Sequence, residues 1–275
     1  ALSLATPSIA VAATQKKATP AKATKATAKA APKKKAHYSA KKKVTRHASV
    51  SGKKALTRVA AHEPFHNRLV TPDVAAPQAL LLNSNAAVVF NESNGEVLFS
   101  KNNTTPMPIA SITKLLTAMV VLDAKLPMDE LISIDEADVD TLRNTGSRLP
   151  VGTTMTRAET MLLALMSSEN RAAAALARNY PGGTAAFVAR MNRKAQAIGM
   201  KNARFYDSTG LNGGNVATAA DLVHLVQAAH DYPEIREFST TQAHELVLGN
   251  GRHLQYRNTN ALVKDEDWNI GLQKT

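Results

Sequence analysis

Apolar residues recur with a regular period only in the later part of the chain, where short alternating runs flank a helical stretch. Runs at 86–90 and 96–99 are joined by Glu-Ser-Asn-Gly, which predicts a β-hairpin with an Asn-Gly turn. Runs at 243–248 and 253–259 flank Gly-Asn-Gly and predict a second hairpin. Residues 268–275 predict the start of one more strand.

Between the hairpins, the apolar positions follow the helical period. Five helices are predicted, at 111–125, 156–166, 170–178, 184–198 and 218–229. Thr156 and Glu159 form a capping box at the start of the second helix, and Gly199 ends the fourth. Strands at both ends and helices in the middle predict an α+β fold. In this fold the first and last strands join one antiparallel sheet, with helices on its faces and in a separate lobe.

Residues 14–77 are predicted to form a disordered basic linker, because repeated Lys, Ala, Thr and Pro provide too little apolar surface for a folded core. Residues 1–62 hold 15 Lys and Arg and no acidic residue, whereas all 22 acidic residues follow them. Two interpretations of this charge stay open. Residues 14–62 either bind anionic polymers of the cell wall or outer membrane, with no specific nucleic acid expected, or act as a solvated tether.

Residues 1–13 resemble the end of a secretory signal peptide, with the small residues Val11-Ala12-Ala13 suited to cleavage. The sequence contains no Cys, which excludes disulfides and thiolate metal sites. No apolar run approaches the ~20 residues of a transmembrane helix. These features together predict an exported protein without a transmembrane segment.

The string His62-Glu63-Pro64-Phe65-His66 has the spacing of the zinc-protease motif His-Glu-x-x-His. That motif needs a regular helix that places both His side chains on one face. Pro64 lies between them and would have to occupy a first turn, and the flanking residues show no helical period. We therefore expect no catalytic zinc here, and no metal or other cofactor in the protein.

Three short strings, in one order, carry the candidate chemistry: Ser111-Ile-Thr-Lys114, Ser168-Glu169-Asn170 and Lys274-Thr275. Ser-x-x-Lys also occurs at Ser39 and Ser51, but both lie in the Lys-rich part, which has no apolar period. Only the set that begins at Ser111 combines order, spacing and a helical context.

A serine hydroxyl is a poor nucleophile and needs a base within hydrogen-bond reach. Ser111 and Lys114 are three residues apart, so on one helix they share a face. A lysine is a base only when neutral, so its pKa must fall from about 10.4 to about 7, and burial in the apolar run after Lys114 can supply such a shift. The alternative is a surface lysine that extends from a core helix. Ser111 near a helix N-terminus also has donors for developing negative charge.

The three strings together are the signature of penicillin-binding proteins and serine β-lactamases. The stretches 108–115, 165–175 and 207–212 most resemble the D-alanyl-D-alanine endopeptidase branch (penicillin-binding proteins 7 and 8) of the low-molecular-mass D-alanyl-D-alanine peptidases. The resemblance covers about residues 78–275 and implies a penicillin-binding transpeptidase/β-lactamase-like fold. It also implies peptidoglycan stem peptides as substrates in the bacterial periplasm, β-lactam antibiotics as covalent inhibitors, and no metal.

The resemblance assigns a role to each residue of the first two strings. Ser111 is the nucleophile and Lys114 its base. Ser168 relays a proton toward the leaving amine, and Asn170 holds the substrate amide and Lys114. We expect Glu169, between these last two, to be an exposed loop acid and not a base.

Lys274 and Thr275 match the first two residues of the Lys-Thr-Gly string of the family, and the resemblance implies that they bind the carboxylate-bearing end of the substrate. The backbone N–H of Ser111 would form half of the oxyanion hole. In the family, the other half, two further strands and a helix follow this string. We therefore expect the peptidase domain to be incomplete at its C-terminus and the chain as given to be inactive.

Two alternatives to an endopeptidase stay open. One is a D-alanyl-D-alanine carboxypeptidase of the same family. The other is a catalytically dead protein that binds wall polymers or other polyanions through its basic tail. A β-lactamase is disfavoured, because class A enzymes carry Ser-Asp-Asn and a loop Glu for deacylation, and that Glu has no convincing counterpart here.

Overall fold

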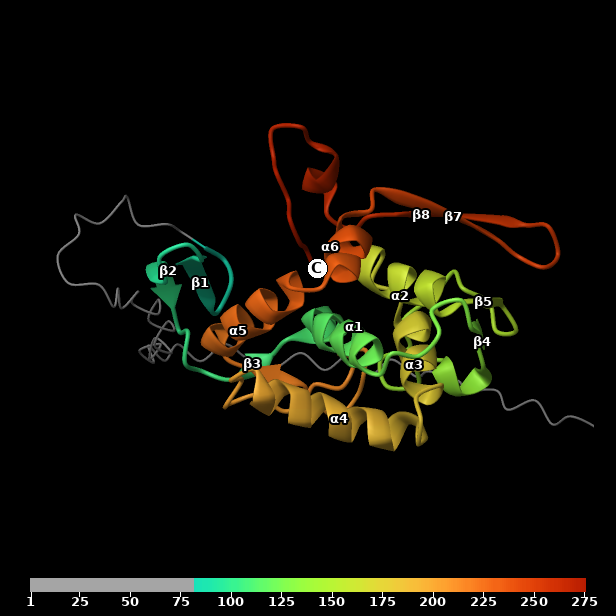
Figure 1. The fold of residues 1–275 in the computed structure, drawn as a ribbon, viewed down its shortest axis with the longest axis horizontal. Helices are drawn as coiled ribbons and strands as arrows, with labels where there is room; N and C mark the ends of the chain where they lie inside the picture. The colour runs from blue at the N-terminus through green and yellow to red at the C-terminus, as the bar shows by residue number, and fades with distance from the viewer. Residues whose placement is uncertain (1–81) are drawn as a thin grey trace, which may run out of the picture. The chain divides into compact units, whose positions relative to one another are not determined.

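Residues 82–275 are described by the computed structural model of the chain, and they form an α+β fold, as the sequence predicts (Figure 1). Helices lie at the centre of this part, and pairs of antiparallel strands lie around them. The predicted signal-peptide remnant, the basic linker and the His62–His66 string lie outside the described residues, so they stay predictions.

The five predicted helices are confirmed to within about two residues at each end, and a sixth is present. They are α1 (Thr113–Asp123), α2 (Arg157–Met166), α3 (Asn170–Arg178), α4 (Gly183–Ala197), α5 (Ala219–His230) and α6 (Pro233–Thr240), with short 3₁₀ turns η1 (Ala110–Ile112), η2 (Glu136–Asp138) and η3 (Ala261–Lys264). The sequence does carry a start signal for α6, since Pro233 occupies its first position and Glu234 lies in its first turn. Within residues 82–275, no helix has the length and apolarity needed to cross a membrane.

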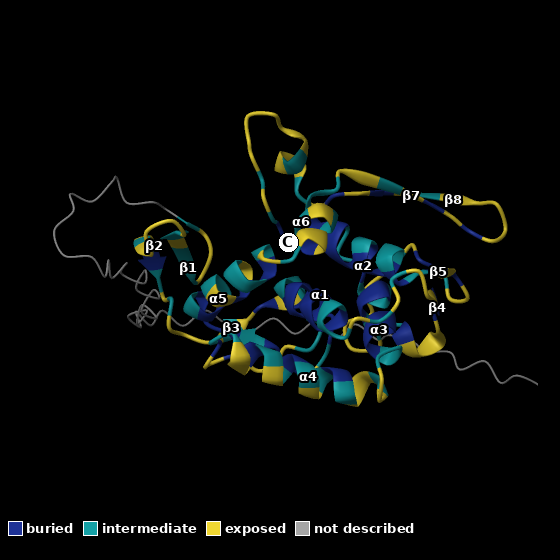
Figure 2. Cartoon of the chain, in the orientation of Figure 1, coloured by how far each residue is buried: buried dark blue, intermediate teal, exposed yellow. Residues whose placement is uncertain are grey.

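Helix α1 forms the centre of the core. Every residue from Thr113 to Val121 is buried, and the helix packs against α2, α3, α4, α5 and α6 (Figure 2). Its sequence is apolar around most of its circumference, which is typical of a helix surrounded by other helices. Lys114 lies in the first turn of α1, so the fold carries an amine into the core.

The strands form four separate antiparallel pairs. They are β1 (Ala87–Asn91) with β2 (Glu96–Lys101), β3 (Met107–Pro108) with β6 (Val216–Ala217), β4 (Leu131–Ser133) with β5 (Thr154–Thr156), and β7 (Ala243–Val247) with β8 (His253–Arg257). The two predicted hairpins, β1–β2 and β7–β8, are confirmed. The prediction that the first and last strands join one sheet is wrong for the described residues, because β1 pairs with β2 alone and packs against α5.

Residues 268–275 do not form the predicted strand. No other strand of the described residues lies alongside to pair with this segment, and the side chain of Gln273 holds it instead. Gln273 is 6% exposed, and its amide donates hydrogen bonds to Ser239 O (2.8 Å) and Asn258 Oδ1 (2.9 Å). An extended sequence pattern is therefore not sufficient here, because a strand also needs a hydrogen-bonding neighbour.

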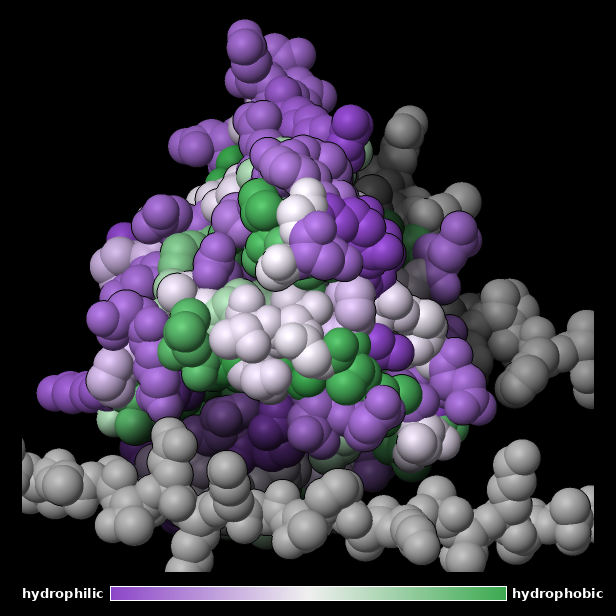
Figure 3. Space-filling model, turned by 90° about the vertical axis from the view of Figure 1, so that its right-hand side faces the viewer, coloured by the Kyte–Doolittle hydropathy of each residue, from purple (hydrophilic) through white to green (hydrophobic). Residues whose placement is uncertain are grey.

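Apolar residues on the face shown in Figure 3 form small patches separated by polar residues. The exposed large apolar side chains of the described residues are Val89, Leu98, Leu131, Leu142, Val151, Tyr206, Val226, Val247, Leu262 and Trp268. They come from strands, one helix and several loops, which is the usual distribution of exposed apolar residues on a folded protein.

Candidate active site

Ser111 lies in η1, immediately before α1, where a neighbouring loop fixes the backbone. Ala110 has a left-handed backbone (φ +45°), and the loop that contains Gly210 packs directly against it. A Cβ on Gly210, whose φ is +86°, would lie 1.9 Å from Ala110 O, so only glycine fits at this position. The loop therefore sets the position of the residue that precedes the candidate nucleophile.

The amine of Lys114 joins segments that are far apart in the sequence. It donates hydrogen bonds to Ser111 Oγ (2.9 Å), Asn170 Oδ1 (2.8 Å) and Thr209 O (2.7 Å). A protonated lysine has three donors, and each of them has an acceptor here. The structure thus brings Ser111, Lys114 and Asn170 into direct contact, as the sequence predicts.

Burial makes Lys114 easier to deprotonate. The residue is 1% exposed, and loss of hydration lowers its pKa from 10.5 to about 8, although the charges of Asp207 and Glu169 act in the opposite direction. The alternative of a surface lysine is therefore wrong. With a pKa near 8, about a tenth of the lysine is neutral at pH 7 and can accept a proton.

Two polar residues that sequence reasoning did not single out hold the Thr209 side of the site. Asp207 accepts hydrogen bonds from the backbone N–H groups of Thr209 (3.2 Å) and Gly210 (2.8 Å). Asn215 is fully buried, and its amide donates to Asp207 Oδ1 (2.8 Å) and to Thr113 Oγ1 (3.2 Å) at the start of α1. The only local signal in the sequence is an Asp followed by small residues and Gly, which is typical of any turn.

The turn between α2 and α3 carries two more candidate residues. Ser168 has a left-handed backbone (φ +61°), and its hydroxyl donates to Thr275 O (3.3 Å). Asn170 is the first residue of α3, and its amide bridges two groups. Oδ1 accepts from Lys114, and Nδ2 donates to Thr145 Oγ1 (3.1 Å). Asn170 therefore links the buried amine to the loop that follows η2.

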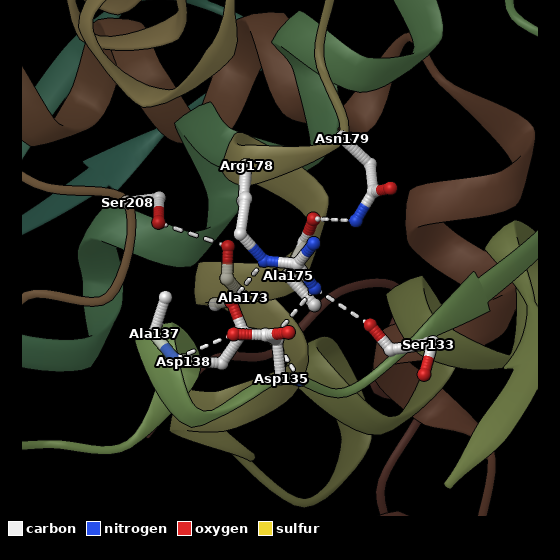
Figure 4. Close-up of polar contacts among 9 residues, drawn as sticks. All are labelled: Ser133, Asp135, Ala137, Asp138, Ala173, Ala175, Arg178, Asn179 and Ser208. Carbon is white, nitrogen blue, oxygen red and sulfur yellow. Dashed lines mark hydrogen bonds and ion pairs between the residues drawn. The ribbon is translucent and has the colours of Figure 1, made fainter. Parts of the chain in front are cut away.

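Side-chain contacts along helix α3 fix its position and therefore the position of its first residue, Asn170 (Figure 4). Arg178, in the last turn, forms a two-pronged ion pair with Asp138, with Nε to Oδ1 at 2.9 Å and Nη2 to Oδ2 at 2.8 Å. This hydrogen bonding raises the pKa of Arg178. Arg178 also donates to Ser133 O (2.6 Å), and Ser208 Oγ donates to Ala173 O (2.9 Å). Contacts to η2, β4 and the 207–212 loop thus hold the helix in place.

Glu169 is not the exposed loop acid that the sequence predicts. It is 8% exposed, and Ser147 Oγ lies 3.0 Å and 2.8 Å from its two carboxylate oxygens. Tyr256 OH lies 3.5 Å from Oε1. The left-handed backbone of Ser168 reverses the chain at this turn, and the Glu169 side chain packs inward between the 146–148 loop and β8.

Lys274 and Thr275 lie on the other side of Ser168. Burial and, second to it, the positive charge of Lys114 lower the pKa of Lys274 to about 7. Because Ser168 Oγ donates to Thr275 O (3.3 Å), the third string lies against the second. Thr275 Oγ1 is hydrogen bonded to Thr259 Oγ1 (2.5 Å), directly after β8.

A pocket of 410 Å³ opens beside the α2–α3 turn, next to Ser168 and Asn170. Its lining residues are Gly146, Ser147, Arg148, Ser167, Ser168, Glu169, Asn170 and Tyr256. Among residues 82–275, no group of three or more His, Cys, Asp and Glu is arranged to hold a metal ion.

Comparison with known proteins shows what the chain is similar to. The family model described as D-alanyl-D-alanine carboxypeptidase, peptidase family S11, matches residues 73–275. A D-alanyl-D-alanine endopeptidase of Pseudomonas aeruginosa is 48% identical over 205 residues, which are 74% of this chain and 66% of the relative. The endopeptidase of Escherichia coli is 44% identical over 215 residues, which are 77% of this chain and 69% of the relative. The chain thus spans about two thirds of the length of these relatives.

Solved structures give the same picture of the fold. The crystal structure of the Streptomyces K15 DD-transpeptidase matches with a TM-score of 0.65 at 27% identity. The match covers 73% of this chain and 81% of that one. The predicted fold, that of the penicillin-binding transpeptidases and serine β-lactamases, is confirmed by this likeness.

Proposed function

Because the chain belongs to the D-alanyl-D-alanine carboxypeptidase family, we propose that it acts as a serine peptidase on peptidoglycan, cleaving D-Ala-containing cross-links through an acyl-enzyme on Ser111. The observation that carries this proposal is the hydrogen bond of 2.9 Å between the buried amine of Lys114 and Ser111 Oγ. A serine hydroxyl becomes an effective nucleophile when a neutral base lies within this distance.

In the proposed reaction, neutral Lys114 takes the proton of Ser111 Oγ, and the oxygen attacks the carbonyl carbon of a D-Ala residue. The backbone N–H of Ser111 donates to the oxygen that becomes negative. The C–N bond then breaks, and the leaving amine receives a proton from Lys114 by way of Ser168. Water later hydrolyses the Ser111 ester and releases the acid. Asn170 Oδ1 and Thr209 O accept hydrogen bonds from Lys114 in both protonation states.

Lys274 and Thr275 are proposed to orient the substrate. Both lie beside Ser168. Lys274 is half-buried, and an incoming carboxylate would stabilise its protonated, charged form. Positioning of this kind gives specificity for a peptide end that carries a free carboxylate.

Endopeptidase activity is favoured over the carboxypeptidase alternative by the pattern of similarity. The relatives at 48% and 44% identity are endopeptidases, whereas a carboxypeptidase of Bacillus subtilis is 29% identical. The alternative of a catalytically dead binding protein is not favoured, because a connected hydrogen-bond set of Ser111, Lys114 and Asn170 is what an active enzyme needs.

The test is acylation by a labelled penicillin, measured on the full-length gene product and on its Ser111→Ala variant. We expect stoichiometric labelling of the parent protein, with the label on the peptide that contains Ser111, and none of the variant. A label on Ser168 or on another serine would overturn the assignment. Hydrolysis of a cross-linked peptide dimer, compared with release of D-Ala from a pentapeptide, distinguishes endopeptidase from carboxypeptidase.

We further propose a periplasmic location, in which residues 14–62 bind anionic wall or outer-membrane polymers by their positive charge. Deleting these residues should leave hydrolysis of small soluble peptides unchanged. Binding to isolated wall material should fall, and the part that is lost should be the salt-dependent part. Binding that survives the deletion and does not respond to salt would contradict this role.

A further inference from the structure

Glu169 is a buried acid that the proposed reaction does not use. It lies between Ser168 and Asn170, two candidate site residues, and it is 8% exposed. A buried carboxylate usually has a cationic partner. Within residues 82–275, the ion pairs join other acids to Arg, Lys and His, and none includes Glu169.

Hydroxyl groups hold the Glu169 carboxylate in place of a cation. Ser147 Oγ contacts both carboxylate oxygens and also accepts a hydrogen bond from Leu149 N–H (3.0 Å), so its position is fixed. Tyr256 is fully buried, and the Arg148 guanidinium lies 4.4 Å above its ring centre. The carboxylate therefore has a defined position between the 146–148 loop and β8.

Two acids from two segments act on the charge of Lys114. Asp207 comes from the loop after Phe205, and Glu169 lies in the α2–α3 turn directly before Asn170, whose Oδ1 accepts from Lys114 (2.8 Å). Asp207 is already committed to holding its loop through hydrogen bonds to Thr209, Gly210 and Asn212. Among the described residues, the Glu169 carboxylate accepts hydrogen bonds from side-chain hydroxyls and from no backbone N–H.

We propose that Glu169 is a positioning residue for proton transfer. Its carboxylate, held by Ser147 and Tyr256, fixes the turn that carries Ser168 and Asn170. It also stabilises the ammonium that forms when Lys114 takes the proton of Ser111. This inference rests on the proposed function. Proton transfer from Ser111 creates a positive charge on Lys114 inside the core, where no water can solvate it. A fixed negative charge in the turn next to Asn170 lowers the energy of that state and does not need to move during the reaction.

The charge of Glu169 also has a cost for the resting enzyme, because it favours protonated Lys114 over the neutral base. Removing this charge should lower the pKa of Lys114. The rise of the acylation rate with pH (the acid limb) should therefore move to lower pH, and the plateau rate at high pH should fall. The expected displacement is on the order of one pH unit, which is the usual spread of side-chain pKa values among protein environments. A base that is weaker by this amount should lower the plateau rate by about threefold to tenfold.

The experiment compares penicillin acylation of the full-length gene product with that of Glu169→Gln and Glu169→Asp across pH 6–10. Glu169→Gln keeps an acceptor for Ser147 but loses the charge, so we expect its acid limb about one pH unit lower. Glu169→Asp keeps the charge, so its limb should stay near that of the parent even if the rate falls. Glu159→Gln, in the capping box of α2, removes an equal charge away from Lys114 and should leave the limb in place.

An unshifted limb in Glu169→Gln, or an equal shift in both Glu169 variants, would overturn the inference and leave a purely structural role. If Glu169→Gln does not fold, Ser147→Ala tests the same idea, because it removes the hydroxyl that holds the carboxylate in place. An acid limb displaced to lower pH in Ser147→Ala would then support the proposal, and an unmoved limb would contradict it. A parent protein that takes no label would instead disprove the proposed function itself.

Discussion

The two halves of the candidate site are built differently. Ser111, Lys114 and Asn170 belong to a set of direct hydrogen bonds at the ends of two core helices, and Lys114 bonds to partners 56 and 95 residues away. Lys274 and Thr275 lie in a segment without helix or strand, in which one side chain, Gln273, makes the buried hydrogen bonds.

From this difference we expect the helical half to carry the chemical step and the C-terminal half to position the substrate. The helical half derives its geometry from core packing, so its atoms keep their distances whether or not a substrate is present. The C-terminal half depends on a few polar contacts and is easier to displace. Changes in the first half should therefore affect the rate of the chemical step, and changes in the second should affect substrate binding.

The largest effect should come from Lys114→Ala. The variant loses the base and leaves Asn170 Oδ1 and Thr209 O without their buried donor. We expect the rate of acylation by penicillin to fall by about 10⁴-fold or more, since members of a catalytic unit fail together. Lys201→Ala, which removes an exposed lysine, serves as the control and should retain the parent rate. A Lys114→Ala protein with a tenth of the parent rate would show that the helical half is not the chemical half.

Gly210→Ala should have the next largest effect, because it strains the backbone beneath the nucleophile. The new Cβ would overlap Ala110 O, and alanine disfavours a φ of +86°. We expect a loss of about 3 kcal/mol in the free energy of unfolding, measured by urea denaturation. Displacement of Ser111 by about 1 Å should also slow acylation by about 10²-fold.

Gly249→Ala is the matched control for this variant. No atom lies within 4 Å of the Cβ position at Gly249, which is in the turn of the second hairpin. Unfolding and acylation should both be unchanged. If both glycine variants behaved alike, the close contact between the 207–212 loop and Ala110 would have no role in the site.

A rise in pH should speed the chemical step of the helical half and weaken substrate binding by the C-terminal half. Lys114 must be neutral to act as a base, so kcat should rise with pH through its pKa of about 8 and level off about one unit higher. Lys274 must be charged to hold a carboxylate, so KM should rise as pH increases through its pKa of about 7. Between pH 7 and 9, kcat should rise about tenfold, and KM should rise about fiftyfold because the charged fraction of Lys274 falls from about a half to about a hundredth.

Lys274→Arg separates these two effects, because arginine stays protonated throughout this range. In this variant the rise in KM should disappear, while the kcat profile keeps its midpoint near pH 8. A kcat midpoint that moved together with KM would mean that Lys274, and not Lys114, supplies the base.

Local signals in the sequence were sufficient for the helical half. The Ala-rich run that begins at Asn170 predicted the bounds of α3, and the Thr156–Glu159 capping box is present with Thr156 Oγ1 accepting from Glu159 N–H (3.1 Å). The Ser111–Lys114 contact follows from a spacing of three residues at the start of a helix. Each of these features depends on residues that are neighbours in the chain.

Apart from the contact between Asn170 and Lys114, which the family resemblance implied, the features that depend on distant residues could not be predicted. Thr209 contributes a backbone oxygen to the site, and no side-chain pattern marks such an acceptor. Glu169 turns inward because Ser147 and Tyr256, which are 22 and 87 residues away, supply hydroxyl partners. Whether residues 268–275 form a strand likewise depends on a neighbouring strand and not on their own propensity.

The smallest effect should come from Gln273→Ala, and it tests the C-terminal half alone. The variant loses the donors to Ser239 O and Asn258 Oδ1, so residues 274–275 lose their anchor. We expect KM for a peptide substrate to rise by about fivefold with kcat nearly unchanged, because Ser111 and Lys114 do not depend on this segment. The loss of two buried hydrogen bonds should also lower the free energy of unfolding by about 2 kcal/mol. Both acceptors keep one other donor, Asn258 Nδ2 for Ser239 O and Asn260 N–H for Asn258 Oδ1. Gln255→Ala removes an exposed glutamine of β8 and should alter neither parameter. A fall in kcat equal to the rise in KM would mean that Gln273 supports the chemical step, and that the site does not divide into two halves.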